Sequence, residues 1–135
     1  MIQRYHTATT EELIQLGKHF GGELKSGDVV ALYGDLGAGK TIFTKGIAFA
    51  LGIQDEVTSP TFNIVSMYDG KMQLVHIDAY RLSGDETIDV LEYVREPYII
   101  VVEWPQQLFE LQSKINKIVR IDINNSGGRD IEIEK

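Results

Sequence analysis

The glycine-rich stretch from Gly34 to Thr41 constrains the fold of this 135-residue chain more than any other feature of its sequence. It reads Gly-Asp-Leu-Gly-Ala-Gly-Lys-Thr and fits G-x-x-x-x-G-K-[ST], the phosphate-binding P-loop. An apolar, β-prone run over 28–33 precedes it, and an apolar-rich helical segment over 42–51 follows it. Because strand, glycine loop and helix are the context that the motif requires, the sequence predicts an α/β, P-loop NTPase-like fold.

The residues of the motif have defined chemical roles. The glycines allow the backbone to curl so that successive N–H groups surround one phosphate. Lys40 supplies a positive charge over the β- and γ-phosphates, and the hydroxyl of Thr41 is a ligand for Mg²⁺. The motif therefore predicts a nucleotide site that uses ATP or ADP with Mg²⁺.

Composition indicates one globular domain over residues 1–135. Hydrophobic residues make up 43% of the chain and charged residues 24%, which is ordinary for such a domain. The sequence has no apolar run of about 18 residues that would cross a membrane, and its first residues lack the apolar centre of a signal peptide. The chain contains no cysteine, which excludes disulfides, thiolate metal sites and a cysteine nucleophile. A cytoplasmic protein without membrane association is expected.

The charge of the chain argues against independent nucleic-acid binding. The formal net charge is −7, and lysine and arginine form no cluster in the sequence. A protein that binds RNA by itself needs a basic face, because neutralising phosphates supplies most of the non-specific affinity.

The remaining elements predict a mixed central sheet, with a parallel core and antiparallel hairpins, flanked by helices. Thr9 and Glu12 have the spacing of a capping box at the start of an amphipathic helix. A turn at Asp69-Gly70 separates two β-prone runs, and the apolar run over 97–102 is typical of a strand buried on both faces. Short helices are expected over 84–94 and 106–111, and a C-terminal hairpin over 115–123 and 129–133.

Two carboxylates end predicted strands and are candidates for catalysis. Asp78 closes the run Leu74–Asp78 in the manner of a Walker B element, and Glu103 follows the buried run over 97–102 beside the only tryptophan, Trp104. The sequence leaves open how these two divide the roles of binding Mg²⁺ and directing the attacking water. His76 is interpreted as a packed, hydrogen-bonded histidine. The hydroxyl-rich loop at 57–62 is either a nucleotide-sensing switch or a polar connector.

Other classes of P-loop protein lack support in the sequence. A GTPase needs a guanine-reading N-K-x-D motif, but after Asn116 and Lys117 the fourth position is Val119. A small-molecule kinase usually has an arginine-bearing lid, and no arginine-rich insert is present. The chain also offers no obvious arginine finger, a residue worth about 10³–10⁵ in rate. An ATPase that turns over slowly and is completed by a partner is the prediction.

Four segments together resemble one family, the bacterial TsaE (YjeE) ATPases of tRNA threonylcarbamoyladenosine biosynthesis. They are Gly34–Thr41, Ser59–Thr61, His76-Ile-Asp-Ala-Tyr-Arg-Leu82 and Val102-Glu-Trp-Pro105, in the order and spacing of the family. The resemblance implies an ATPase of low intrinsic activity that works with two partners, TsaB and TsaD. It acts in forming threonylcarbamoyladenosine at position 37 of tRNAs reading ANN codons, is not the transferase itself, and meets tRNA only through the complex.

The resemblance also implies a set of site residues. Nucleotide contacts fall on Thr10, Gly37, Ala38, Gly39, Lys40, Thr41, Ile42, Trp104 and Arg129, and Mg²⁺ on Thr41 and Glu103. Lys40, Asp78 and Glu103 are the implied catalytic residues. Local pattern alone would instead leave Arg129 exposed. Ile42 stands where the family often has a second threonine, which removes one hydroxyl but leaves the Mg²⁺ ligand Thr41.

Two other functions stay open at this point. One is a free-standing P-loop kinase of a small metabolite, and the other is a regulatory nucleotide-binding module without catalysis.

Overall fold

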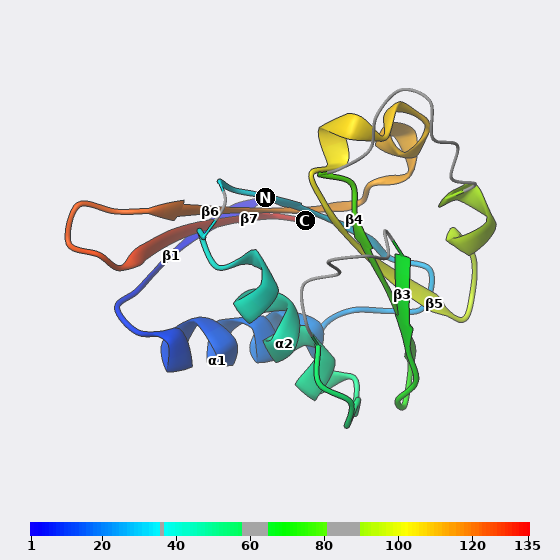
Figure 1. Cartoon of the computed structure of the whole chain (residues 1–135), viewed down its shortest axis with the longest axis horizontal. Coiled ribbons are helices and arrows are strands. Elements are labelled where there is room, and N and C mark those ends of the chain that lie inside the picture. The colour runs from blue at the N-terminus through cyan, green and yellow to red at the C-terminus, as the bar shows by residue number, and fades with distance from the viewer. Residues whose placement is uncertain (36, 58–64, 81–89) are drawn as a thin grey trace.

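The computed structural model describes residues 1–35, 37–57, 65–80 and 90–135. In these residues the chain forms a seven-stranded mixed sheet with the spatial order β1-β7-β6-β2-β5-β4-β3. Two α-helices cover one face of the sheet, and short 3₁₀ helices lie on the other side (Figure 1). The elements are β1 (Ile2–Thr7), α1 (Thr10–Gly21), β2 (Val29–Tyr33), α2 (Lys40–Ala50), β3 (Val65–Tyr68), β4 (Gln73–Asp78), η1 (Val90–Tyr93), β5 (Tyr98–Glu103), η2 (Pro105–Gln107), η3 (Phe109–Lys114), β6 (Lys117–Ile123) and β7 (Arg129–Glu134).

The centre of the sheet is parallel and buried on both faces. Strand β2 pairs in parallel with β5 on one side and β6 on the other, and β4 pairs in parallel with β5. Val30 and Leu32 face the core beneath α1 and α2, whereas Val29 faces the core beneath the 3₁₀ helices. The apolar runs that predicted buried strands are explained by this double coverage.

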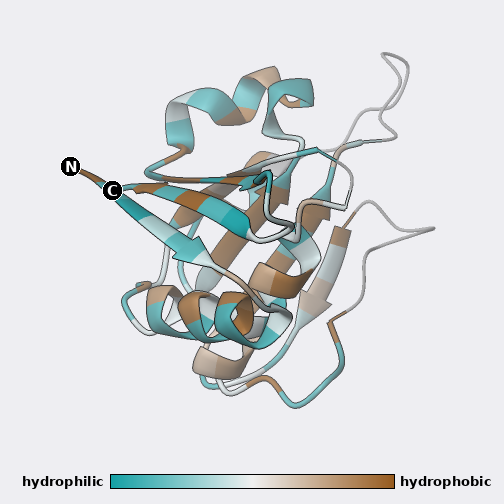
Figure 2. Ribbon diagram, turned by 90° about the vertical axis from the view of Figure 1, so that its left-hand side faces the viewer, coloured by the Kyte–Doolittle hydropathy of each residue, from teal (hydrophilic) through white to brown (hydrophobic). Residues whose placement is uncertain are grey.

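The strands near the termini follow a different pattern. Strands β6 and β7 form the predicted antiparallel hairpin, and their residues alternate between apolar and polar (Figure 2). Ile131 and Ile133 are buried in the core, and Glu132 between them forms ion pairs with Arg4 and Arg120. One face of this part of the sheet therefore meets solvent, as alternation predicts.

Strand β1 was not predicted from the sequence. It pairs antiparallel with β7, from Ile2 opposite Glu134 to Thr7 opposite Arg129. Most of its side chains are exposed or half-buried, as expected at the edge of a sheet. The short, polar sequence of β1 does not by itself indicate a strand. The strand forms because it pairs with β7, which lies more than a hundred residues away in the chain.

The predicted capping box is present at the start of α1. The Thr9 hydroxyl accepts a hydrogen bond from the Glu12 N–H at 3.1 Å, and the Glu12 carboxylate accepts one from the Ala8 N–H at 3.0 Å. The carboxylate thus reaches one residue further back than in the standard motif.

Helix α1 packs against α2 through glycines. A Cβ on Gly17 would overlap the carbonyl oxygen of Phe43, and a Cβ on Gly46 would overlap that of Ile14. The two helix backbones therefore touch directly. Because α2 begins at Lys40, this contact also holds the P-loop against the start of α1.

One expected helix differs from its prediction, and much of a second lies outside the described residues. The segment 106–111 forms part of η2 and η3, two short 3₁₀ helices, with the Gln112 side chain donating to the carbonyl oxygens of Pro105 and Leu108. Of the segment 84–94, the described part contains the 3₁₀ helix η1, and residues 81–89 lie outside the described residues, as do Leu36 and the loop 58–64. No helix in the described part of the chain is long and apolar enough to span a membrane.

Candidate active site

The P-loop follows β2 and leads into α2. Gly37 and Gly39 have φ angles of 81° and 115°, values that residues with a Cβ rarely adopt. Gly39 is the N-cap of α2 and has no side chain to accept a hydrogen bond from the first turn, so the helix N–H groups that follow it are left for another acceptor. A loop of this kind at a helix N-terminus is suited to bind an anion.

Lys40 lies inside the loop and is only 5% exposed. Its Nζ donates to the carbonyl oxygen of Gly34 at 2.5 Å and stands 4.0 Å from the centroid of the Trp104 ring. Burial lowers the pKa of Lys40, and the carboxylates of Glu103 and Asp78 oppose that change. The ammonium group is therefore poorly hydrated and would gain from an added anion.

The predicted carboxylates meet at one edge of the sheet. Asp78 and Glu103 end the parallel strands β4 and β5 and are opposite each other in register. They follow the same alternation as Leu74 and Ile99, whose side chains face the core under α1 and α2. Both carboxylates therefore point toward the side on which Lys40 begins α2.

The two carboxylates have different surroundings. Glu103 is 4% exposed, and its Oε2 lies 2.6 Å from Nε2 of His76. Asp78 is half-buried, and its Oδ1 accepts a hydrogen bond from the Tyr80 N–H at 3.0 Å. Burial raises the pKa of Asp78, and the nearby Glu103 carboxylate adds to that rise. His76 is thus the hydrogen-bonded histidine that the sequence predicts, but its partner was not foreseen.

Trp104 closes this side of the site with an unusual backbone. Its φ and ψ are 58° and 50°, the left-handed region, although it carries a large side chain and precedes Pro105. Strain of this kind is common where a side chain must be held for function. Its ring packs on the ring of Tyr80, with 4.9 Å between the two centroids. The Lys40 ammonium group lies over the same Trp104 ring. Tyr80 in this role was not predicted.

Arg129 reaches the P-loop from β7. Its Nε donates to the carbonyl oxygen of Ala38 at 2.6 Å, and an Nη donates to that of Gly37 at 3.3 Å. The other Nη donates to the carbonyl oxygens of Gly127 and Gly128. This half-buried position differs from the exposed one that local pattern favoured, because the contact depends on tertiary structure.

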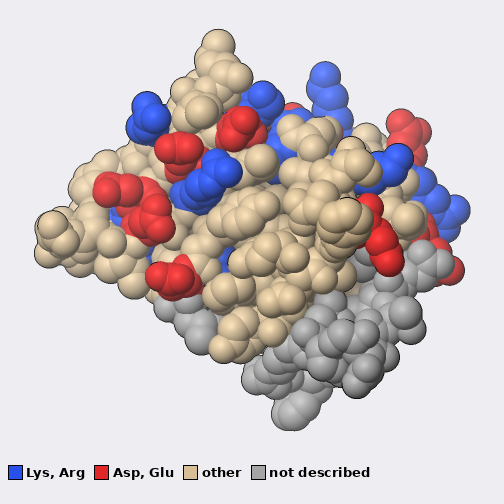
Figure 3. Space-filling model, turned by 90° about the horizontal axis from the view of Figure 1, so that it is seen from above, with Lys and Arg blue, Asp and Glu red and all other residues tan. Residues whose placement is uncertain are grey.

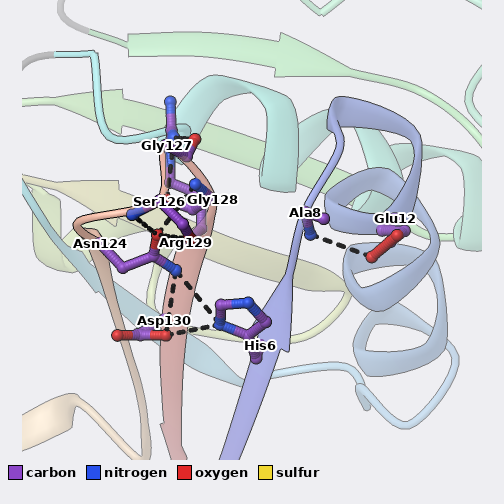
Figure 4. A network of polar contacts seen from close by, with 9 residues as sticks. All are labelled: His6, Ala8, Glu12, Asn124, Ser126, Gly127, Gly128, Arg129 and Asp130. Atoms are coloured by element: carbon purple, nitrogen blue, oxygen red, sulfur yellow. Dashed lines mark hydrogen bonds and ion pairs between the residues drawn. The ribbon is translucent and has the colours of Figure 1, made fainter.

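A hydrogen-bonded turn presents Arg129 to the loop (Figure 4). The Asn124 side chain accepts from the N–H groups of Ser126 and Gly128, and His6 bonds the Asp130 carboxylate at 2.8 Å. The same view places this turn near the start of α1, where Ala8 and Glu12 lie.

Thr10 is the first residue of α1 and is exposed. Leu13, one turn further on, lies against Gly39, since a Cβ on that glycine would come within 2.6 Å of it. The start of α1 is thus at the P-loop, as the resemblance implies, but its contact with a nucleotide stays a prediction. Ser59–Thr61 and Arg81 lie outside the described residues.

The donors present suit Mg²⁺. Within the described residues, no three His, Cys, Asp or Glu side chains form a metal-ligand cluster. Mg²⁺ in nucleotide sites needs none, because it is usually held by one or two carboxylates and phosphate oxygens. The Thr41 hydroxyl, next to Lys40, and the Glu103 carboxylate are donors of the right kind.

Asn116 and Lys117 lie at the opposite end of β2. Both donate to the Asp28 carboxylate, at 2.8 and 3.0 Å, and Asp28 directly precedes the strand. The only Asn-Lys pair in the sequence is therefore far along β2 from the P-loop, where a base-reading motif would not be useful.

The sequence matches a known family over nearly the whole chain. The sequence model for "Threonylcarbamoyl adenosine biosynthesis protein TsaE" matches residues 7–131. The chain belongs to the TsaE family. Among TsaE proteins it is similar to the tRNA threonylcarbamoyladenosine biosynthesis protein TsaE of Treponema pallidum, with 35% identity over 128 residues covering 93% of this chain and 95% of that protein.

Other TsaE proteins agree with this assignment. The protein of the same name from Bacillus subtilis is 42% identical over 109 residues, covering 79% of this chain and 69% of that one. The crystal structure of YdiB from Bacillus subtilis superposes with a TM-score of 0.82 at 33% identity, covering 98% of this chain and 84% of that chain. The mixed α/β fold of this TsaE-family chain is therefore that of a solved structure.

An Asp78→Asn variant tests the electrostatics of the site. A raised folded pKa means that protonation of Asp78 stabilises the fold at low pH, and that this stabilisation is lost as the pH rises through the folded pKa. The variant cannot ionise, so we expect its Tm at pH 7 to exceed that of the natural protein. The gain should shrink as the pH falls through the raised folded pKa of Asp78 and be lost below about 4, the ordinary pKa of aspartate. The difference in Tm between the variant and the natural protein is measured by thermal unfolding in EDTA over a series of pH values.

Asp28→Asn is the matched control with the opposite sign. Burial alone would raise the pKa of Asp28, but hydrogen bonds from Lys25, Asn116 and Lys117 outweigh it and lower the pKa. This variant should lose stability at pH 7, and the loss should shrink in acid. A lower Tm for Asp78→Asn at pH 7 would contradict the electrostatic account of the site.

Proposed function

We propose that this chain is a Mg²⁺-dependent ATPase of low intrinsic activity that takes part in forming threonylcarbamoyladenosine at position 37 of tRNAs reading ANN codons. It acts together with TsaB and TsaD and is not the transferase itself. Membership of the TsaE family supports the place in tRNA modification.

The observation that carries the proposed ATPase activity is the convergence of three groups on one corner of the molecule. The buried Lys40, at the start of α2, comes under the combined field of the Asp78 and Glu103 carboxylates at the ends of β4 and β5. A cation between uncapped helix N–H groups and paired carboxylates suits a phosphate chain with its Mg²⁺.

The residues would divide the work as follows. The N–H groups of 37–42 bind and orient the phosphates, and Lys40 moves from the Gly34 carbonyl to the transferring phosphoryl group. Thr41 and Glu103 hold Mg²⁺, which when bound neutralises negative charge on the phosphates. Asp78, which is more accessible than Glu103 and has a raised pKa, would orient the attacking water.

The expected rate without partners is low. Among the described residues, Arg129 is the arginine bonded to the P-loop, and its donors are directed at four carbonyl oxygens. It therefore braces the loop instead of reaching the transferring phosphoryl group. A partner that supplies a further positive charge would accelerate hydrolysis.

The surface charge supports indirect contact with tRNA. Figure 3 shows lysine and arginine side chains interspersed with aspartate and glutamate on the face that it draws, and the whole chain carries a net charge of −7. A protein with this balance of charges gains little affinity for RNA from neutralising its phosphates. The proposed complex would therefore bind tRNA through its other members.

Reconstitution of tRNA threonylcarbamoylation tests the proposal. TsaB, TsaD, the threonylcarbamoyl donor and tRNA are combined with and without this chain, and modified adenosine is measured over several turnovers. Multiple turnovers are expected only with the chain and ATP. Equal turnover without it would contradict the proposed role, and transfer of the γ-phosphate to a small metabolite would favour a kinase.

A further inference from the structure

His76 is the polar exception in a buried stretch of β4. Its side chain is completely buried, and its partner in register on β5 is Val101. The neighbouring residue on the same face of β4 is the core residue Leu74. An aliphatic side chain would fill this position without placing an imidazole in an apolar core.

The imidazole makes one hydrogen bond among the described residues, and it is to Glu103. Nε2 lies 2.6 Å from Oε2, and Nδ1 is buried without a partner in the same part of the chain. Since a carboxylate accepts and does not donate, Nε2 carries the proton. Oε2 of Glu103 is thereby bound to a fully buried side chain, and Oε1 has no hydrogen-bond partner among the described residues, which leaves it for another ligand.

We infer that His76 is a positioning residue, which holds the Glu103 carboxylate in the orientation that binds Mg²⁺ with its other oxygen. The inference rests on the proposed nucleotide site. Ligands of a metal are themselves commonly oriented by hydrogen bonds from a second layer of residues, and losing such a partner typically lowers metal affinity about 10–100-fold. Among the described residues, Asp78 accepts a hydrogen bond from the Tyr80 backbone N–H and none from a side chain.

Two substitutions separate this role from simple packing. His76→Leu keeps an apolar side chain of similar volume but removes the donor. His76→Gln places an amide N–H near the position of Nε2 and so preserves the hydrogen bond. Leu74→Ala is the control, because it weakens the same face of β4 without touching Glu103.

The measurement is the affinity for ADP by calorimetry, once in EDTA and once in excess MgCl₂. The gain in affinity caused by Mg²⁺ is expected to fall about 10–100-fold in His76→Leu, while binding in EDTA stays within about twofold of the natural protein. His76→Gln should recover most of the gain, and Leu74→Ala should keep it. Titration of Mg²⁺ at fixed ADP gives the same ranking independently of hydrolysis.

Each other result overturns the inference. An undiminished Mg²⁺ effect in His76→Leu shows that Glu103 needs no support, and equal losses in His76→Gln and His76→Leu, or a loss in Leu74→Ala, point to packing alone. The proposed function survives those results. A natural protein that shows no Mg²⁺-dependent binding of ADP would overturn both.

Discussion

Replacing Lys40 with alanine is expected to lower ATP hydrolysis by about 10²–10³-fold, the usual cost of removing a preorganised charge or donor from a reacting site. Lys40 is buried between the P-loop and the Trp104 ring, and burial lowers its pKa, so its charge is held at an energetic cost before nucleotide arrives. That charge has most to gain from a phosphate. Hydrolysis with saturating MgATP and ADP affinity by calorimetry measure the loss.

Lys18→Ala is the control for Lys40→Ala. It removes the same charge from an exposed position in the last turn of α1 and should leave both quantities unchanged. Because a buried, poorly hydrated cation stabilises the fold little, Lys40→Ala should unfold at a Tm close to that of the natural protein. Hydrolysis within about fivefold of normal in a folded Lys40→Ala protein would contradict the role of the P-loop lysine, since it would fall far short of the expected loss.

Gly46→Ala is expected to destabilise the fold by about 2–3 kcal/mol, although alanine is the better helix former. The added Cβ would overlap the Ile14 carbonyl oxygen and come within 2.9 Å of the Gly17 Cα. Both are backbone groups, which no rotamer change can move aside. The two helices would have to separate, and urea unfolding with an unchanged m-value would report the cost.

Gly22→Ala provides the contrast. Gly22 has φ −66° and ψ −17°, and a Cβ there would meet its nearest atom, the His19 carbonyl oxygen, at 3.5 Å. Alanine fits this conformation, so the substitution should be neutral or stabilise the protein by up to about 1 kcal/mol. If the Gly46→Ala protein proved as stable as the Gly22→Ala protein, the result would contradict the direct backbone contact between α1 and α2.

Local sequence was enough for much of the fold. The P-loop, its flanking strand and helix, the buried strand β5, both hairpins and the cap of α1 were predicted and are present. Each depends on a property that neighbouring residues determine together. Glycines permit positive φ, apolar runs indicate burial on both faces, and Asp-Gly favours a tight turn.

Local sequence was not enough for β1 or for the segment 106–111. The first residues alternate too weakly to indicate a strand, and β1 exists because β7 offers it an edge. The segment 106–111 was expected to form one helix, but it divides between η2 and η3. For β1, pairing with a distant strand outweighs local preference.

The candidate site divides in the same way. The sequence by itself determined the P-loop, the two carboxylates at strand ends and the tryptophan beside them, because motif spacing and strand ends are local features. Only the tertiary structure decided that His76 bonds Glu103, that Tyr80 packs on Trp104 and that Arg129 braces Gly37 and Ala38. Those contacts join residues that are far apart in the sequence. The separation is 24 positions for Tyr80 and Trp104, 27 for His76 and Glu103, and 92 for Gly37 and Arg129. Their geometry arises from strand order and register, which no local pattern of side chains specifies.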